Sequence, residues 1–363
     1  MARLRRVDVS SPGIRREKHG DELEYFEESG VPVTDPEVLA RIAELVIPPA
    51  WKDVWISPYP MGHIQATGMD AKGRKQYLYH QQWRERRDQA KFDDMVAFAR
   101  ALPAMRARVD EHLDVGPDQT ASRTLARERV LACAVRLLDR GFFRVGGESY
   151  AAENETYGLA TMHKKHVRLE DGAIEFDYIA KSGKRRIQTV VDPEVYDIIG
   201  RLKRRRGGNP ELLAYKRGRQ WVDLKSADIN EYLKEAAGGD FSAKDFRTWN
   251  ATLLAAQALA VSAPAAKGSA STRKRAITRA VKEVSHYLGN TPAVARTSYI
   301  DPRVFDRFNA GLTVSGALTE TGGAGDVASI HGPMEKAVLD LITEHESWAV
   351  EPVEAVEGLA LAS

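Results

Sequence analysis

The segment from His166 to Val191 constrains the fold most, because it has a clear β pattern inside a region of helical periodicity. Its residues read HVRLEDGAIEFDYIAKSGKRRIQTVV. Every second residue from Ile174 to Tyr178 is apolar, as in a strand with one buried face. Asp171-Gly172 and Ser182-Gly183 are turn signals typical of hairpins. The pattern predicts a three-stranded antiparallel sheet inserted into a mainly helical domain.

Helical periodicity lies on both sides of this segment. Thr120 to Arg140 has apolar residues at helical spacing, with Gly141 as the predicted stop, and helices are expected to resume near Pro193. The single cysteine, Cys133, lies within the first of these helices, which favours a small core residue over a nucleophile. Residues 262–274 are small, polar and basic, and this composition predicts a mobile loop.

The first 80 or so residues mix short strands with one or two helices. Asp35-Pro36 is a helix start, with a cap followed by proline at the first helical position. Residues 63–80 predict a hairpin with its turn around Asp70 to Gly73. The charged stretch from Gln81 to Lys91 is either a hinge into the next domain or the first turns of a helix.

These patterns predict an α+β protein in three parts. A small mixed β/α N-terminal domain spans 1–90, and a larger, mainly helical domain with the sheet insertion spans 91–312. An acidic C-terminal tail, 313–363, contains one helix candidate from about Met334 to His345.

Charge is divided unevenly between these parts. Residues 313–363 hold nine acidic residues and one lysine, a net −8, so that residues 1–312 carry +10 of the total of +2. Five basic clusters on the +10 body favour a polyanionic partner. No apolar run approaches the ~20 residues that span a bilayer, and Met1 to Lys18 has no apolar signal-peptide core. We therefore expect a cytoplasmic protein without a membrane association.

Four segments contain residues suited to DNA strand transfer: RVGGESYAAENETYGLATM, IAKSGKRR, KDFRTWNAT and LGNTPAVARTSYIDP. The reaction needs a nucleophile, fixed cations that face the non-bridging phosphate oxygens, and an acid for the leaving 5′ oxygen. Arginine binds two oxygens with a permanently charged planar fork, and a lysine in a cationic site can donate a proton. A tyrosine ester of the phosphate conserves bond energy. Two arginines, a lysine and a tyrosine are therefore a sufficient set without metal or ATP.

These segments resemble the type IB DNA topoisomerases, in particular the compact poxvirus-like and bacterial subfamily. The resemblance extends to IPPAWKDVWI and QATGMDAKGRKQYLYH near the N-terminus and covers roughly residues 20–305. It implies that Tyr299 is the nucleophile, that Arg144 and Arg247 bind the phosphate, and that Lys181 is the general acid. The DNA-contacting residues that it implies are Gln76, Tyr77, Tyr79 and Tyr150, with Lys244 as a basic residue that supports the site.

Asn290 departs from the pattern of poxviral and eukaryotic members, which commonly have histidine nine residues before the tyrosine. Asparagine still donates a hydrogen bond to a non-bridging oxygen, but it carries no charge. Some bacterial members resemble this chain at that position, so the departure fits the bacterial branch.

The activity implied by the resemblance is relaxation of supercoiled duplex DNA. One strand is cut through a 3′-phosphotyrosyl intermediate, swivels and is rejoined, without ATP, metal or another cofactor. The expected partner is duplex DNA, with no obligate protein partner. We expect a monomer that closes as a clamp around DNA in the bacterial nucleoid.

Three alternatives are weaker. A tyrosine site-specific recombinase shares the tyrosine chemistry, but recombinases usually have histidine where Lys244 stands and lack a domain like residues 20–80. A non-catalytic DNA-binding protein predicts decay of the four-residue set, which is intact. A magnesium nuclease needs a carboxylate cluster that the sequence does not offer.

His163 and His166 have no carboxylate or cysteine nearby in sequence, which favours a structural or DNA-facing role over a metal pair.

Overall fold

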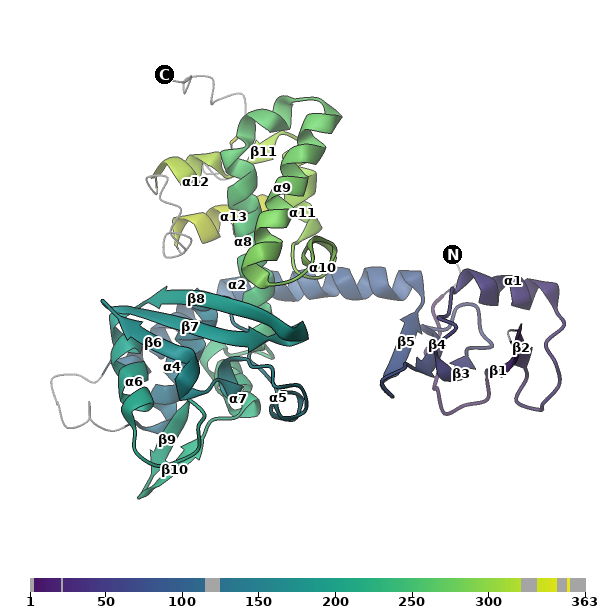
Figure 1. Ribbon diagram of the computed structural model, residues 1–363. Coiled ribbons are helices and arrows are strands. Elements are labelled where there is room, and N and C mark those ends of the chain that lie inside the picture. The colour runs from purple at the N-terminus through teal and green to yellow at the C-terminus, as the bar shows by residue number, and fades with distance from the viewer. Residues whose placement is uncertain (1–2, 21, 115–124, 321–331, 345–350, 353–363) are drawn as a thin grey trace. The chain divides into compact units, whose positions relative to one another are not determined.

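The computed structural model describes residues 3–20, 22–114, 125–320, 332–344 and 351–352. The chain divides into two compact units, Met1–Asp93 and Asp94–Ser363, and each is described by itself (Figure 1).

The first unit is a five-stranded antiparallel sheet with one short helix. The strand order is β2-β1-β3-β4-β5. Its elements are β1 (Ile14–His19), β2 (Glu22–Phe26), α1 (Pro36–Glu44), β3 (Lys52–Ile56), β4 (Ile64–Met69) and β5 (Lys75–Tyr79). Ile42 of α1 joins apolar residues of β1, β3 and β4 in one buried cluster. The predicted helix start is confirmed, because the Asp35 side chain accepts a hydrogen bond from the Glu37 amide.

The predicted hairpin near the end of this unit is also confirmed. Strands β4 and β5 pair antiparallel, and Asp70 accepts hydrogen bonds from the backbone of Lys72 and Arg74 in the turn between them. Helix α2 (Gln81–Leu113) follows at once. The charged stretch from Gln81 to Lys91 is therefore the first part of a helix, and the division between the two units falls within that helix.

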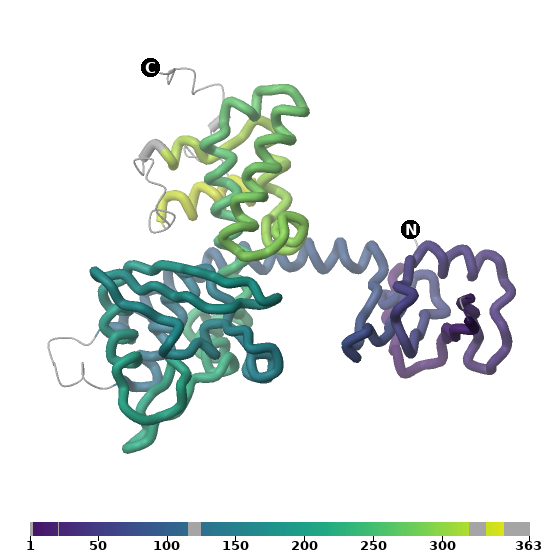
Figure 2. The backbone as a smooth tube through the Cα atoms, viewed as in Figure 1, coloured from purple at the N-terminus to yellow at the C-terminus, as the bar shows by residue number. Residues whose placement is uncertain are grey.

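The second unit contains a three-stranded antiparallel sheet among helices. The sheet order is β6-β7-β8, and Figure 2 shows β7 and β8 as one long hairpin. The elements up to this hairpin are α4 (Arg127–Gly141), α5 (Glu148–Asn154), η1 (Leu159–Thr161), η2 (Lys164–His166), β6 (Val167–Glu170), β7 (Ala173–Ala180), η3 (Lys181–Gly183) and β8 (Lys184–Val191). The inward-facing residues Ile174, Phe176 and Tyr178 are buried. Phe143 packs edge-on against Phe176, so the sheet covers the end of α4.

A second group of elements, mostly helices with four short strands, follows the sheet in the described part of the chain. In order these are α6 (Pro193–Arg204), β9 (Ala214–Arg217), β10 (Gln220–Asp223), α7 (Ser226–Ala237), α8 (Ala243–Val261), η4 (Ala263–Lys267), α9 (Ala270–Leu288), α10 (Pro292–Ser298), α11 (Pro302–Asn309), β11 (Leu312–Thr313), α12 (Ser315–Glu320), α13 (Pro333–Thr343) and β12 (Glu351–Pro352). Helix α8 is the centre of this group, because α9, α11 and α13 all pack against it (Figure 1).

Helix α13 packs into this unit. Its apolar residues Met334, Ala337, Val338, Leu341 and Ile342 are buried. The Glu335 carboxylate accepts hydrogen bonds from the Trp249 indole of α8 (3.1 Å) and from both terminal nitrogens of Arg106 of α2 (2.6 and 2.8 Å). A helix thus lies in the segment where one was predicted, but it ends at Thr343 and packs into the second unit; His345 lies outside the described residues.

Two sequence predictions were wrong in detail. Helix α4 begins at Arg127 rather than near Thr120, with Ala126 in extended conformation as its N-cap; residues 115–124 are not described. Helix α4 includes Gly141, and the left-handed residue that ends it is Phe142 (φ 54°). The predicted loop 262–274 is largely helical: η4 occupies Ala263–Lys267, and Ser269 caps the start of α9 by accepting a hydrogen bond from the Thr272 amide.

Cys133 is fully buried in α4, as predicted for a core residue. Burial raises the pKa of its thiol, and this keeps the thiol protonated and unreactive. No helix among the described residues has the length and apolar character that crossing a membrane requires.

Candidate active site

The loop after α4 places Arg144 at the entrance of a pocket. Its backbone is fixed, because the carbonyls of Arg144 and Val145 accept hydrogen bonds from the amides of Leu159 (2.8 Å) and Ala160 (2.7 Å). This approach requires glycine: a Cβ on Gly158 would lie 2.5 Å from the Gly146 Cα. The GGESY and ETYGL parts of the first motif are therefore the two sides of one close backbone contact.

Arg247 lies on the buried face of α8 and is 4% exposed. Its Nη1 donates to the Phe142 carbonyl and its Nη2 to the Leu288 carbonyl, both at 2.9 Å. These two carbonyls follow α4 and end α9, so Arg247 connects three helices. Lys244 lies in the first turn of α8 and is exposed.

Tyr299 ends the short helix α10 and is half-buried. Its amide donates to the Ala295 carbonyl, and the Thr252 hydroxyl of α8 lies 3.4 Å from the Tyr299 carbonyl. The same hydroxyl accepts from the amide of the fully buried Asp301 (3.1 Å), which caps α11. The backbone that follows the tyrosine is thus fixed to α8, the helix that carries Arg247.

Asn290 follows the residue that ends α9, and its Oδ1 accepts a hydrogen bond from Arg144 Nη2. These residues are 146 positions apart in the chain. Lys181 lies at the turn between β7 and β8 and is exposed.

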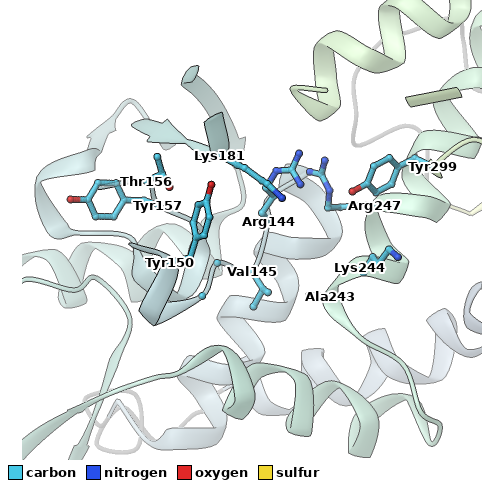
Figure 3. A pocket seen from close by; sticks show the side chains of 12 residues that line it. Arg144, Val145, Tyr150, Thr156, Tyr157, Lys181, Ala243, Lys244, Arg247 and Tyr299 are labelled. Atoms are coloured by element: carbon cyan, nitrogen blue, oxygen red, sulfur yellow. The ribbon is translucent and has the colours of Figure 1, made fainter. Parts of the chain in front are cut away.

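One pocket of about 350 Å³ contains most of the predicted site residues. Figure 3 shows Arg144, Arg247 and Lys181 directed toward the same space, with the Tyr299 ring beside Arg247. The lining includes Arg144, Tyr150, Lys181, Lys244, Arg247 and Tyr299. Asn290 is joined to this group through Arg144.

The charges of the pocket act on its tyrosine. Burial raises the pKa of Tyr299, but the positive charges of Arg247 and Arg144 outweigh burial, and the pKa is lowered from its ordinary value. The Arg247 guanidinium carbon is 5.1 Å from the centre of the Tyr299 ring. Burial and the nearby Arg144 charge lower the pKa of Arg247 to about 10, which still leaves it charged at neutral pH.

Two buried donors of this group, Arg247 Nε and Asn290 Nδ2, have no hydrogen-bond partner among the described residues. Buried donors without partners are rare, because each loses its hydrogen bonds to water. Two such donors beside one cationic pocket are what an anion-binding site offers to a bound oxyanion.

Three of the predicted DNA-contacting residues do not line this pocket. Gln76, Tyr77 and Tyr79 belong to β5 of the first unit. Tyr77 and Tyr79 are exposed on one face, with ring centres 6.0 Å apart, whereas the Gln76 amide is bound to Asp70 in the turn.

Sequence reasoning did not identify two further residues of the pocket wall, Thr156 and Tyr157. The Thr156 hydroxyl is buried, and no residue in the described part of the chain is its hydrogen-bond partner. The Tyr157 ring packs against His163 and His166, with centres 4.9 and 4.5 Å away, and burial lowers the pKa of His166 to about 4. This packing fits the structural role expected for the two histidines. Among the residues that the structure describes, no group of three or more His, Cys, Asp or Glu side chains is placed to hold a metal.

Comparison with known proteins gives matches over most of the chain. The catalytic core of eukaryotic DNA topoisomerase I matches residues 80–309, and the N-terminal domain of bacterial DNA topoisomerase IB matches residues 22–70. The DNA topoisomerase 1B of Acanthamoeba polyphaga mimivirus is 32% identical over 297 residues, which cover 79% of this chain and 85% of the viral protein. The DNA topoisomerase 1B of vaccinia virus (strain Copenhagen) is 22% identical over 241 residues, 66% of this chain and 71% of that protein.

Proposed function

We propose a mechanism for this chain on the premise that it belongs to the type IB DNA topoisomerase family. The enzyme is an isomerase that acts on DNA. In the proposed reaction Tyr299 Oη attacks a backbone phosphorus in line with the 5′ oxygen. A 3′-phosphotyrosyl bond forms, and the bond from phosphorus to the 5′ oxygen breaks. The free 5′-hydroxyl strand swivels and then attacks the phosphotyrosine, which restores the phosphodiester and the phenol.

The observation that carries this proposal is the pair of partnerless buried donors beside two arginines and a tyrosine. The transition state has extra negative charge on the non-bridging oxygens. Arg247 Nε, Asn290 Nδ2 and the Arg144 guanidinium would bind these oxygens. Because Arg247 is already fixed by two carbonyls, it needs no reorganisation when the charge develops.

The nucleophile loses its proton as the tyrosyl bond forms. The positive charges of Arg247 and Arg144, which lower the pKa of Tyr299 against the opposing effect of burial, favour the phenolate. In the proposed step the proton leaves to water. No side-chain base is required.

The leaving 5′ oxygen gains a proton as its bond breaks. Lys181 reaches the pocket from the exposed turn between β7 and β8 and donates this proton from its ammonium group. In religation the neutral lysine takes the proton back from the 5′-hydroxyl. Because the phosphotyrosyl bond has an energy close to that of the phosphodiester, the cycle needs no ATP.

DNA contacts outside the reacting phosphate are assigned to both units. Tyr150 and Lys244 line the pocket and would contact the backbone beside the cleavage site. Gln76, Tyr77 and Tyr79 would contact the duplex from the first unit. We propose that a single copy of the chain closes its two units around duplex DNA of the bacterial nucleoid.

The direct test is relaxation of a supercoiled plasmid in EDTA without ATP, with the wild type and Tyr299→Phe compared. We expect the wild type to relax any plasmid and to form a covalent adduct under denaturing conditions. Tyr299→Phe is expected to do neither while still binding DNA. Activity that requires paired cognate sites would indicate a recombinase, and an adduct formed by Tyr299→Phe would place the nucleophile elsewhere.

A further inference from the structure

The last carbonyls of α9 are bound by two arginines from different elements. Arg186 of β8 donates from Nη1 to the His286 carbonyl (2.7 Å) and from Nη2 to the Tyr287 carbonyl (2.5 Å). Arg247 donates to the next carbonyl, that of Leu288. The end of a helix leaves carbonyls without intrahelical partners and carries partial negative charge, so arginine is well suited to this position.

This contact connects two parts of the active site. Arg186 pairs with Tyr178 across the hairpin whose turn carries Lys181. Helix α9 ends at Gly289 (φ 64°), and Asn290 follows directly. The fit is close, because a Cβ on Gly289 would lie 3.1 Å from Arg186 Nη1. Arg186 therefore fixes the strand that follows Lys181 against the helix that precedes Asn290.

The other strand of the hairpin is attached on a different side. The Ile179 carbonyl of β7 accepts a hydrogen bond from the Tyr157 amide (2.8 Å). Arg186 is half-buried and lines a small crevice next to Lys181. Arg144 and Arg247 line the same crevice, whereas Arg186 does not line the substrate pocket itself. A residue next to Lys181 but outside the substrate pocket can act on the reaction through Lys181 and does not contact the substrate.

We propose that Arg186 is a positioning residue for strand cleavage, and that it holds the Lys181 ammonium at the distance from the phosphate-binding arginines that proton donation requires. This inference rests on the proposed function, in which Lys181 is the general acid. A misplacement of about 1 Å in a reacting group is enough to cost on the order of 10²-fold in rate.

The test compares Arg186→Gln with Arg185→Gln in single-turnover cleavage at saturating DNA. Arg185 is the matched control, because it lies next to Arg186 on β8 but is exposed and forms a two-point ion pair with Asp177 (2.6 and 2.8 Å). Each variant is given ordinary DNA and DNA whose bridging 5′ oxygen is sulfur. A thiolate leaves without a proton, so a defect in proton donation disappears on sulfur.

We expect Arg186→Gln to cleave ordinary DNA on the order of 10–100-fold more slowly, with unchanged DNA affinity, and to regain nearly the wild-type rate on sulfur. Arg186→Lys, which keeps the charge and part of the donor set, is expected to be intermediate. Arg185→Gln is expected to match the wild type on both substrates. A slow rate of Arg186→Gln on both substrates, or equal defects in the two glutamine variants, would overturn the proposal.

Lys181→Ala and the double variant Lys181→Ala/Arg186→Gln separate this inference from the proposed function. If sulfur does not rescue Lys181→Ala, the acid assignment fails. The positioning claim is then decided by the double variant on ordinary DNA. If Arg186 acts through Lys181, the double variant cleaves no more slowly than Lys181→Ala, whereas a further tenfold loss would show that Arg186 acts by another route.

Discussion

The site has two halves that are built in different ways. The arginine half consists of Arg247, Arg144 and Asn290, and the lysine half is Lys181. Arg247 is 4% exposed and fixed by two carbonyls on the central helix of its unit, whereas Lys181 is exposed at a hairpin turn. Binding of developing charge benefits from donors that do not move. A proton donor that must be restored in each cycle benefits from access to solvent. We therefore propose that charge stabilisation belongs to the helical core and proton transfer to the sheet insertion.

The largest effect that separates the two halves is expected for the lysine. Lys181→Ala should cleave ordinary DNA roughly 10²–10⁴-fold more slowly, the loss typical of a missing general acid, and should be rescued by a bridging sulfur. Lys181→Arg is the sharper variant, because it keeps the charge, but a guanidinium holds its proton far more tightly than an ammonium group and is a poor proton donor. We expect it to be slow on oxygen and fast on sulfur. Because Lys181 is exposed, the melting temperature should not change; full activity of Lys181→Arg would show that only charge is needed.

The corresponding change in the arginine half should be insensitive to the leaving group. Arg247→Ala is expected to lose roughly 10²–10³ in cleavage rate, as for a missing oxyanion donor, on oxygen and sulfur alike. It should also lower the melting temperature, since the carbonyls of Phe142 and Leu288 lose their donor. Rescue of Arg247→Ala by sulfur would assign it to proton transfer and remove the distinction between the halves.

Helix α8, which carries Arg247, is bound in turn by α13 through Trp249 and Glu335. Glu335→Gln keeps the shape of the side chain but removes the negative charge that pairs with Arg106. It also leaves one acceptor oxygen, in place of two, for Arg106 and Trp249. We expect a loss of roughly 1–3 kcal/mol in the free energy of unfolding, measured by urea denaturation. Glu344→Gln is the matched control, because this residue of the same segment is 76% exposed in its ion pair with Arg307. Its change should stay within about 0.5 kcal/mol.

Truncation after Leu312 would remove α13 and its packing. Because five apolar residues of α13 are buried, we expect truncation to destabilise the second unit. A truncated protein with unchanged unfolding would show that α13 adds nothing to the core.

The sequence predicted local patterns better than contacts between distant segments. Asp35-Pro36 and the alternation at 174–178 carry strong local signals, and both elements lie where expected. The hairpin β9–β10 was not predicted. Lys216, Arg217 and Arg219 form one of the five basic clusters of the sequence, and this charge pattern hides the turn at Gly218 (φ 59°). Residues 270–274 were assigned to a loop, since small polar residues obscured the Ser269 cap.

The site itself was predictable as a set of residue types but not as an arrangement. Motifs pointed to Arg144, Lys181, Arg247 and Tyr299, and these residues line one pocket. No periodicity indicates that Arg144 binds Asn290, or that Arg186 binds the end of α9, because these contacts join segments about 100 residues or more apart. Such pairs are set by tertiary packing, which a local pattern does not record.

Asn290 gives the smallest and most specific prediction for the arginine half. Its Oδ1 is used by Arg144, which leaves the buried Nδ2 as a donor for a phosphate oxygen. A neutral histidine can accept from Arg144 with one ring nitrogen and donate with the other, so Asn290→His should keep its relaxation activity.

When protonated, that histidine donates from both ring nitrogens, so it no longer accepts from Arg144, but it adds a positive charge opposite the phosphate. Since a hydrogen bond from a charged donor is stronger by about 1 kcal/mol, cleavage should be roughly fivefold faster than in the wild type at low pH. The gain should be lost as the pH rises through the imidazole pKa, ordinarily ~6.5 and expected to be lower here because Arg144 disfavours a second positive charge. Asn290→Ala, which has no donor, should be slower than the wild type at every pH. If Asn290→His instead follows the wild-type rate across the whole pH range, residue 290 does not face the phosphate.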